Sequence, residues 1–445
     1  MSCRWHRKIA PAVTCASKVC PAKDRQNPEI KAINMMSRLE HVEEEKINYD
    51  FFLNLPEIDR SKLERIDIRT SQLITPLFEY SGACSGCGET PYIKLLTQLY
   101  GDRMLIANAT GCSSIYGGNL PSTPYTTDAN GRGPAWANSL FEDNAEFGLG
   151  FRLTVDQHRV RVLRLLDQFA DKIPAELLTA LKSDATPEVR REQVAALRQQ
   201  LNDVAEAHEL LRDADALVEK SIWLIGGDGW AYDIGFGGLD HVLSLTENVN
   251  ILVLDTQCYS NTGGQASKAT PLGAVTKFGE HGKRKARKDL GVSMMMYGHV
   301  YVAQISLGAQ LNQTVKAIQE AEAYPGPSLI IAYSPCEEHG YDLALSHDQM
   351  RQLTATGFWP LYRFDPRRAD EGKLPLALDS RPPSEALEET LLHEQRFRRL
   401  NSQAARSGRT VMERCCKLNL QKRYDFLAQM DRKKRKKATP IKCTG

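Results

Sequence analysis

The sequence predicts an α/β fold built on a mainly parallel β-sheet with helices on both sides. Short apolar runs recur along the chain, as expected for strands that are buried on both faces. Most of these runs end at or just before glycine, asparagine, cysteine or serine, residue types that form turns and sites. Helical patterns lie between the runs. This alternation is typical of parallel sheets, in which ligands bind beyond the carboxyl ends of the strands.

The predicted strands are apolar runs that are too short and too uninterrupted for amphipathic helices. In chain order they are Arg103–Asn108, Ser221–Ile225, Asn250–Asp255, His299–Ser306 and Ser328–Tyr333.

Two helices are predicted between these strands, over Gly238–Glu247 and Ala309–Ala323. In the second helix, Leu311, Val315 and Ile318 are spaced to form one apolar face. We therefore expect this face to pack on the sheet.

Residues 153–219 interrupt the strand pattern and are rich in Leu, Ala, Glu, Arg and Gln. A break at Asp184–Pro187 predicts two helices, whose charged faces favour exposure to solvent. We interpret this segment as a helical insertion without a catalytic constellation.

The remaining chain divides around this α/β region, which we place at residues 77–355. Residues 1–47 show little apolar periodicity, and residues 48–76 form a polar linker. Residues 356–445 form a long carboxyl-terminal arm that is proline-rich, then helical, and ends in a basic tail.

Composition narrows the class of protein. The 445 residues include 57 Lys and Arg against 55 Asp and Glu, which argues against nucleic-acid binding by the whole chain. No apolar run approaches the ~20 residues that span a bilayer, so we expect a cytoplasmic protein. Eleven cysteines in such a protein indicate metal or redox chemistry rather than disulfides. Residues 396–445 hold 16 Lys and Arg against three acids, a composition typical of a solvated terminus.

A glycine-rich segment carries the first candidate site. Cys84 and Cys87 form a Cys-x-x-Cys motif, while Cys112 follows one predicted strand and Cys336 ends another. Four thiolates at one edge of the sheet suffice for an iron–sulfur cluster. Four thiolates also suit zinc, and a lone Cys-x-x-Cys is equally compatible with a redox pair or with no function.

The second candidate site begins with a Gly-Asp-Gly sequence directly after a predicted strand. Asp228 offers a carboxylate oxygen, and Gly227 and Gly229 let the backbone approach a ligand closely. Thr256 follows the next strand, 28 residues later, in a loop rich in hydroxyl, amide and carbonyl oxygens. Such a pair of loops suits a diphosphate held through Mg²⁺, and the spacing is similar to that of the thiamine diphosphate motif. A simple Asp-Gly turn is the alternative.

The other cysteines are weaker candidates for site residues. Cys3, Cys15 and Cys20 retain only the last part of a ferredoxin-type ligand run, Cys20-Pro21, and do not complete a cluster. Cys258 lies in the second loop, where its backbone carbonyl is the relevant group. We interpret three cysteines of the tail as incidental: Cys415, Cys416 and Cys443.

Five segments of the chain closely resemble the carboxyl-terminal part of the pyruvate:ferredoxin/flavodoxin oxidoreductases. They are SGACSGCGETPYIK (81–94), ATGCSSIYGGNLPSTPY (109–125), GGDGWAYDIGFGGLDH (226–241), YSNTGGQASKATP (259–271) and GPSLIIAYSPC (326–336). The resemblance runs from about Val19 to about Gln403 and resumes over 420–430. It implies a thiamine diphosphate-binding fold, thiamine diphosphate, Mg²⁺ and one proximal [4Fe–4S] cluster. The implied reaction is oxidative decarboxylation of pyruvate with coenzyme A to acetyl-CoA and carbon dioxide.

The resemblance also implies a role for each matching residue. Cys84, Cys87, Cys112 and Cys336 are the implied cluster ligands, which favours iron–sulfur over zinc. Glu89 and Cys112 are implied to lie against thiamine. The Mg²⁺ ligands are implied to be Asp228, Thr256 and the Cys258 carbonyl, and Asn261 is the implied catalytic residue facing pyruvate. The implied diphosphate-binding residues are Gly227, Asp228, Gly229, Trp230, Thr256, Gln257, Cys258, Tyr259, Ser260 and Asn261.

Flavodoxin or ferredoxin is the implied electron acceptor, and a homodimer is the implied assembly, with no membrane or nucleic-acid partner. The sequence departs from the family at both ends, because residues 1–18 and most of the tail do not resemble it. Residues 1–47 then read as the remnant of a ferredoxin-like domain for two clusters. We expect a truncated, frame-disrupted copy with little activity in isolation. The alternatives are a non-catalytic remnant that binds the cofactors and the β-type subunit of a two-subunit enzyme.

Overall fold

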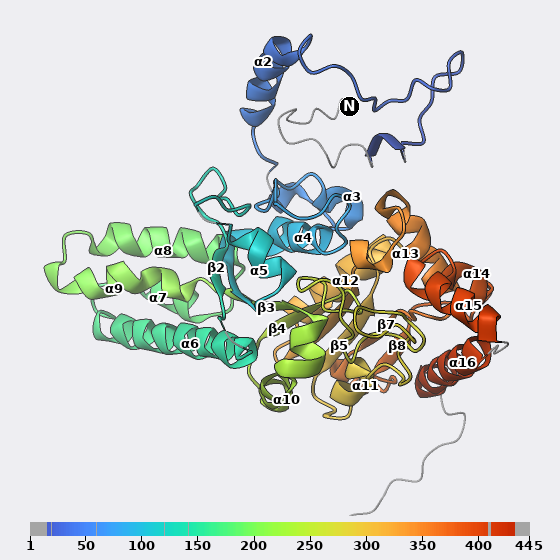
Figure 1. The fold of residues 1–445 in the computed structure, drawn as a ribbon. Helices are drawn as coiled ribbons and strands as arrows, with labels where there is room; N and C mark the ends of the chain where they lie inside the picture. Colours follow the sequence, from blue (N-terminus) through green and yellow to red (C-terminus); the bar gives the residue numbers. More distant parts are fainter. Residues whose placement is uncertain are drawn as a thin grey trace, which may run out of the picture.

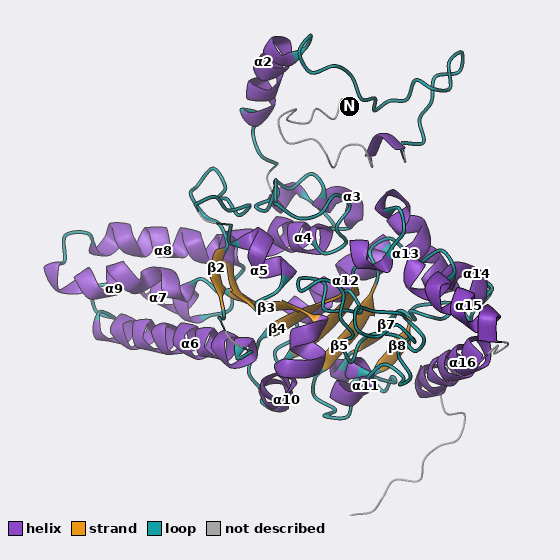
Figure 2. Ribbon diagram, viewed as in Figure 1, coloured by secondary structure: helices purple, strands orange, loops and turns teal. Residues whose placement is uncertain are grey.

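The chain folds around an eight-stranded sheet with the strand order β2-β1-β3-β4-β6-β5-β7-β8 (Figures 1 and 2). This computed structural model describes residues 16–18, 20–58, 60–119, 121–140, 142–407 and 411–431. The strands are β1 (Met104–Asn108), β2 (Ala135–Asn138), β3 (Ser221–Gly227), β4 (Asn250–Asp255), β5 (Tyr301–Ile305), β6 (Ser328–Tyr333), β7 (Tyr362–Phe364) and β8 (Leu376–Leu378).

The expected mainly parallel sheet is confirmed. Strands β1 to β6 pair in parallel, whereas β7 pairs antiparallel with β5 and with β8. Strands β4 and β6 occupy the predicted residues, and the other predicted strands differ by one or two residues at their ends. The sequence did not predict β2, β7 and β8, which are strands of only three or four residues at the two ends of the sheet.

Both faces of the sheet are buried, which explains the uninterrupted apolar runs. In β3, Ile222 and Leu224 enter one hydrophobic core, whereas Trp223 and Ile225 enter a second core on the opposite face. Helices α10 (Phe236–Ser244) and α11 (Leu290–Met295) pack in the first core. Helices α4 (Thr90–Tyr100) and α12 (Leu311–Glu322) pack in the second.

The predicted apolar face of α12 needs one correction. Val315 and Ile318 are buried, but Leu311 is 39% exposed. Leu311 is the first residue of the helix, so it lies beyond the end of the packed face.

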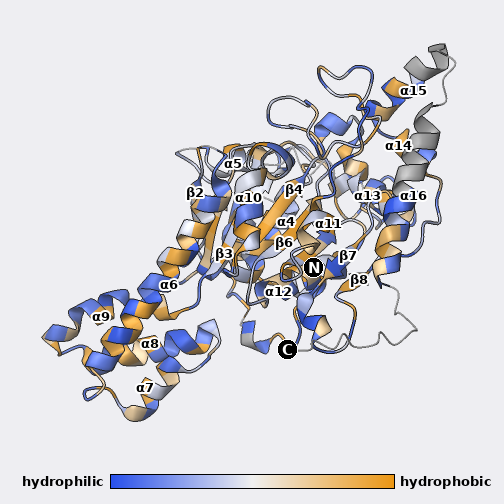
Figure 3. Cartoon of the chain, turned by 90° about the horizontal axis from the view of Figure 1, so that it is seen from below, coloured by the Kyte–Doolittle hydropathy of each residue, from blue (hydrophilic) through white to orange (hydrophobic). Residues whose placement is uncertain are grey.

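The insertion contains four helices rather than the two expected, because the charged stretches conceal short turns between them. They are α6 (Asn144–Gln168), α7 (Ala175–Lys182), α8 (Pro187–Leu201) and α9 (His208–Asp213). Leu166, Leu197 and Leu210 are fully buried in a third core that belongs to these helices. Figure 3 shows the four helices projecting from the end of the sheet next to β2 and β3.

Helices outside the sheet layers complete the chain. Helix α2 (Val42–Leu53) has no buried residue, and α3 (Ile68–Ser71) and α5 (Cys112–Gly117) are short. The carboxyl-terminal helices are α13 (Ser346–Ala355), α14 (Leu387–Leu391), α15 (Gln395–Ser407) and α16 (Val411–Asp431). None of the helices in the described ranges is long and apolar enough to cross a membrane.

Candidate functional site

Four neighbouring parallel strands bring the predicted site residues to one edge of the sheet. Strands β1, β3, β4 and β6 are consecutive in the sheet order and run in the same direction. Cys112, Asp228, Thr256 and Cys336 each follow the carboxyl end of one of these strands. This is the edge at which open parallel sheets bind ligands.

The Gly-Asp-Gly sequence turns the chain from β3 into a π-helical turn over Gly229–Ile234. Insertions of this kind are frequent at functional sites. A side chain at Gly227 would meet only the Leu254 carbonyl oxygen, at 4.0 Å, so the backbone there is open to a ligand. A side chain at Gly229 would instead collide with the ring of Tyr259, at 2.9 Å. This close packing requires glycine and joins the first loop to the second. Trp230 is buried behind them.

The second loop is a tight turn after β4. Tyr259 pairs with Gln265 in an antiparallel bridge, and the amide of Gly264 donates to the Tyr259 carbonyl oxygen. Gln257, at the start of the loop, is fully buried and has a positive φ of 61°. Asn261 lies exposed at the tip of the turn.

The two loops meet at the hydroxyl of Thr256. Its Oγ1 lies 3.0 Å from Asp228 Oδ1, 3.1 Å from the Cys258 carbonyl oxygen and 3.3 Å from Ser260 Oγ. The three proposed Mg²⁺ ligands therefore lie together. Asp228 Oδ2 is buried and accepts no hydrogen bond from the residues described here. A buried carboxylate oxygen without such a bond is the kind of atom that a hard divalent cation satisfies.

The electrostatics of Asp228 support the same assignment. Burial, reinforced by the nearby charge of Asp255, holds the pKa of Asp228 well above its usual range. Hydrogen bonds from Ser267 and Thr256 offset only part of this effect. The protein alone thus leaves the ionised carboxylate under-compensated, and the Asp228 site fits a positive ion.

The Cys-x-x-Cys loop packs against the end of β6. The amide of Gly88 donates to the Pro335 carbonyl oxygen at 2.9 Å, and Gly88 has no room for a side chain beside Pro335. Gly86 has a positive φ of 80°, which favours glycine. These contacts bring Cys84 and Cys87 beside the loop that carries Cys336.

The thiols of the four proposed cluster ligands influence one another. Burial is the main cause that raises the pKa of Cys84, Cys87 and Cys112, and the charge of Cys336 contributes to each. Cys336 also shares a hydrogen bond with the thiol of Cys258, which lowers the pKa of Cys336. Four free thiols of this kind fit an iron–sulfur cluster in donor chemistry. Within the described ranges, however, no three His, Cys, Asp or Glu side chains form a ready-made ion site.

Glu89 is a buried carboxyl group close to this cluster of thiols. It is 3% exposed, and it accepts a hydrogen bond of 2.9 Å from the hydroxyl of Tyr116. Burial raises the pKa of Glu89 to about 7. The charge of Glu89 contributes to the raised pKa of both Cys87 and Cys112. Cys112 Sγ in turn lies 3.5 Å from Ser260 Oγ of the second loop.

Several residues at this edge were not predicted. Asp255 ends an apolar run, and this position predicts only the end of a strand. In the structure it is a fully buried carboxylate at the site. His339 is fully buried, and its Nε2 lies 2.7 Å from the Thr256 carbonyl oxygen. Arg287 and Arg396 are buried ion-pair residues in stretches whose composition indicates surface. Only the tertiary structure identifies them.

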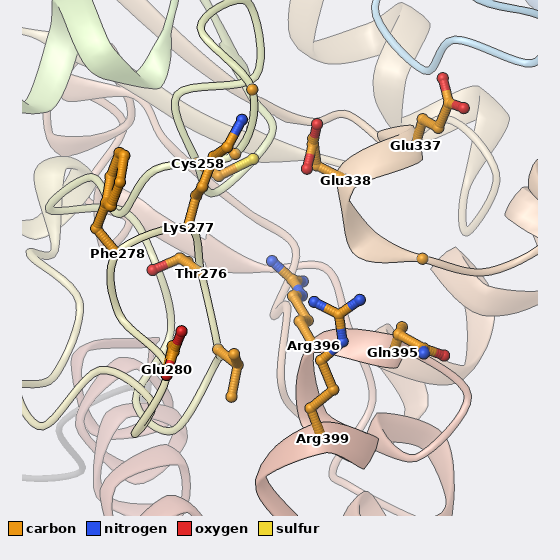
Figure 4. A pocket seen from close by; sticks show the side chains of 14 residues that line it. Cys258, Thr276, Lys277, Phe278, Glu280, Glu337, Glu338, Gln395, Arg396 and Arg399 are labelled. Carbon is orange, nitrogen blue, oxygen red and sulfur yellow. The ribbon is translucent and has the colours of Figure 1, made fainter.

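A pocket of about 750 Å³ lies beside the second loop, between that loop and the loop after Cys336 (Figure 4). Of the predicted site residues, Cys258 lines it. Its charged lining residues, of both signs, come from three separate segments, which explains why the sequence did not reveal it. They are Lys277, Glu280, Glu337, Glu338, Arg396 and Arg399.

Cys20 lies near the amino-terminal end of the described chain, with its sulfur 3.8 Å from the Ala22 carbonyl oxygen. Cys3, Cys15 and Cys443 lie outside the described residues, as do the side chains of Cys415 and Cys416.

Comparison with known proteins bears on the two loops directly. Residues 207–332 match the family model described as "Thiamine pyrophosphate enzyme, C-terminal TPP binding domain". The chain is also 94% identical, over 422 residues, to the "Probable pyruvate-flavodoxin oxidoreductase" of Escherichia coli strain K12. The predicted resemblance is confirmed. The matched residues amount to 95% of this chain and 36% of the E. coli protein.

More distant relatives carry the same description. The "Pyruvate-flavodoxin oxidoreductase" of Nostoc sp. strain PCC 7120 is 51% identical over 408 residues, which are 89% of this chain and 34% of that protein. The chain therefore spans about a third of the length of the curated relatives it matches.

Among solved structures, a 2-oxoglutarate:ferredoxin oxidoreductase from Magnetococcus marinus, with 2-oxoglutarate, coenzyme A and succinyl-CoA bound, aligns with a TM-score of 0.37. The alignment has 15% sequence identity and covers 79% of this chain and 94% of that one. A likeness at this level supports no functional statement.

Proposed function

We propose that this chain is the thiamine diphosphate-binding and cluster-binding part of a pyruvate:flavodoxin/ferredoxin oxidoreductase. The reaction is the oxidative decarboxylation of pyruvate with coenzyme A, which yields acetyl-CoA and carbon dioxide. Flavodoxin or ferredoxin receives the two electrons through iron–sulfur clusters. The supporting observation is that Asp228, Thr256 and the Cys258 carbonyl meet inside the segment that matches a thiamine pyrophosphate-binding domain.

The chain's own residues then have distinct roles. Asp228, Thr256 and the Cys258 carbonyl hold Mg²⁺, and the open backbone at Gly227 receives the diphosphate. When bound, thiamine diphosphate supplies a carbon nucleophile and an electron sink for cleavage of the 2-oxo acid. Asn261, exposed at the tip of the second loop, orients the substrate.

Glu89 has a buried carboxyl group with a pKa of about 7, so it can hold or release a proton near neutral pH. The charge of Glu89 raises the pKa of Cys112, and this supports the proposal that both residues lie against thiamine. Cys84, Cys87, Cys112 and Cys336 would hold one [4Fe–4S] cluster, which would supply a one-electron redox centre.

We place this activity in the cytoplasm and in a homodimer. The proposed division of the chain follows the sequence boundaries: a ferredoxin-like remnant (1–47), a linker (48–76), the cofactor domain (77–355) with its insertion (153–219), and the carboxyl-terminal arm (356–445).

Calorimetry with the purified chain tests the cofactor assignment. Thiamine diphosphate should bind with Mg²⁺ present and bind much more weakly with EDTA, because Asp228 would hold the diphosphate only through the metal. Thiamine monophosphate is the matched control ligand and should bind weakly in both conditions. Equal affinity for the two thiamine phosphates would contradict the proposal.

An anaerobic assay addresses catalysis. Pyruvate, coenzyme A and methyl viologen are added to the chain loaded with thiamine diphosphate, Mg²⁺ and iron–sulfur cluster. Viologen reduction that is lost in Asn261→Ala, with cofactor affinity retained, supports a catalytic chain. Cofactor binding without pyruvate-dependent reduction supports the alternative of a non-catalytic remnant.

A further inference from the structure

Asp255 fixes the start of the second loop from inside the protein. This carboxylate is fully buried at the end of β4, and its Oδ1 accepts a hydrogen bond of 3.1 Å from the amide of Gln257. Gln257 has a positive φ, a conformation that most residues avoid and that neighbouring contacts must stabilise. The contact with Asp255 therefore helps to set the direction of residues 256–261.

Arg287 supplies the positive charge that a buried Asp255 requires. Arg287 Nη2 donates to Asp255 Oδ2 at 2.7 Å and to the Tyr232 hydroxyl at 2.9 Å. The Tyr232 hydroxyl also donates to Asp255 Oδ2, at 2.7 Å. The guanidinium lies 4.9 Å from the ring centroid of Trp359, so an aromatic ring and a carboxylate hold it in place. The side chain of Arg287 is 11% exposed, and that of Asp255 is fully buried.

The ion pair between Arg287 and Asp255 matters for the site because the carboxylates of Asp255 and Asp228 are both buried at the same edge of the sheet. Asp255 ends β4, and Asp228 directly follows the adjacent strand β3. Two like charges at this edge repel each other, and the guanidinium of Arg287, 2.7 Å from Asp255 Oδ2, offsets the charge of Asp255. Without Arg287, Asp255 would be a buried charge without an ion-pair partner beside the proposed Mg²⁺ ligands.

The carboxyl-terminal helix α16 is joined to the same arrangement. Arg423 on α16 pairs with Asp289 and donates to Gln304 Oε1 at 3.0 Å. Asp289 accepts a hydrogen bond from the amide of Val292 at the start of α11. The negative charge of Asp289 also stabilises the ionised form of Arg287. Alternating charges thus connect α16 to β4.

We propose that Arg287 is a positioning residue for the diphosphate-binding loop: through Asp255 it holds residues 256–261 where Thr256 and Cys258 can share a divalent cation with Asp228. The inference rests on the proposed function for the identity of the ligand, but the effect on the loop does not depend on the ligand.

Three variants of the full chain separate positioning from general stability. Arg287→Met removes the charge and keeps most of the apolar stem, and Arg287→Lys keeps the charge. Arg363→Met is the matched control, because Arg363 on β7 has an equally buried side chain and pairs with Glu320 of α12 and with Asp379, which follows β8. A fourth variant, Arg287→Met with Asp255→Asn, removes both charges of the pair.

Two measurements are made on each variant. Calorimetry with thiamine diphosphate and Mg²⁺ should show an affinity loss of roughly tenfold or more for Arg287→Met, the size typical of coupled neighbouring groups. Arg287→Lys and the double variant should each recover part of this loss. Arg363→Met should lower the melting temperature but change the affinity by less than about twofold, since it lies outside the network.

Hydrogen exchange of the cofactor-free chain gives a readout that no cofactor influences. Amides of residues 256–261 should exchange faster in Arg287→Met than in wild type and keep their protection in Arg363→Met. If exchange of this loop is the same in both variants, the positioning role is wrong. If the loop loosens in Arg287→Met but the wild type binds no thiamine diphosphate, the proposed function fails and the positioning role stands.

Discussion

The buried carboxylate of Asp228 lowers the stability of the fold but suits the binding of a cation. The fold buries its carboxylate next to Asp255 and satisfies only one of its oxygens within the described structure. Such an arrangement costs free energy in the absence of a cation, because a buried charge requires compensation. We interpret that cost as the signature of a site prepared for Mg²⁺.

Replacement of Asp228 by Asn should therefore separate binding from folding. Asp228→Asn keeps the shape and removes the charge, so the affinity for thiamine diphosphate with Mg²⁺ should fall by about 100-fold or more, beyond the 10–100-fold typical of outer residues at metal sites. The cofactor-free chain should melt at the same or a higher temperature. Calorimetry and thermal unfolding measure the two effects.

Asp233 provides the control for this prediction. It lies in the same π-helical turn, and its carboxylate already pairs with Lys268 at 3.3 Å. Asp233→Asn should leave the affinity nearly unchanged. A similar loss in both variants would indicate that the turn, and not the Asp228 carboxylate, is what binding requires.

At the residue scale, the sequence predicted those contacts that short motifs encode. Asp228 and Thr256 follow consecutive predicted strands, so their proximity could be expected from parallel pairing. Arg287 and Asp255 are different, because their pairing depends on how the intervening residues 256–286 fold back onto the end of β4. No local pattern distinguishes Arg287 from the exposed basic residues around it.

Glu322 ties three elements together at the end of α12. Its carboxylate accepts hydrogen bonds from the side chains of Arg103 at 2.7 Å, Ser221 at 2.7 Å and Asn250 at 3.0 Å. These residues lie in or beside β1, β3 and β4, at the amino-terminal edge of the sheet. The helix is thereby fixed across the strands whose opposite ends carry the site.

Glu322→Ala should destabilise the chain by roughly 3–5 kcal/mol, because it leaves the largely buried Arg103 without its carboxylate. Glu322→Gln, which keeps the shape and part of the hydrogen bonding, should cost less. Urea unfolding measures both. An effect below about 1 kcal/mol for Glu322→Ala would place this pair among the weak surface ion pairs.

The pH dependence of Glu322 has a definite sign. Burial raises the pKa of Glu322 above its unfolded value, even with Arg103 nearby. The folded state then holds the proton more tightly, so this group's contribution is fully present below the unfolded pKa and is lost as pH rises through the folded pKa. Glu322→Gln should remove this part of the slope of unfolding free energy against pH.

At the element scale, predictions succeeded where burial on both faces made a strand uninterrupted and apolar, as in β4 and β6. They failed for β7 and β8, since a three-residue strand has too short a pattern to be recognised. They also failed for the insertion, whose third core is shared among helices that are each mostly polar.

The whole molecule brings the four proposed cluster cysteines, from three separate segments, to one edge of the sheet. A cluster site and separate thiols differ in their iron content. After anaerobic reconstitution we expect about four irons and four labile sulfides per chain, the content of a single [4Fe–4S] cluster.

Single replacements of Cys84, Cys87, Cys112 or Cys336 by Ala should each abolish the broad visible absorbance of the reconstituted chain. Cys20→Ala is the control and should leave it unchanged, because Cys20 lies outside the proposed ligand set. One bound zinc without sulfide would contradict the iron–sulfur assignment.

The antiparallel pair β7–β8 closes one side of the sheet, and helix α16 lies against β8. An exposed edge strand offers unpaired amide and carbonyl groups to another chain, and it is a common starting point for aggregation. Here the edge is only three residues long and is covered by a helix. Helix α16 therefore protects the molecule from intermolecular β-pairing, and its loss would threaten solubility as well as the geometry of the site.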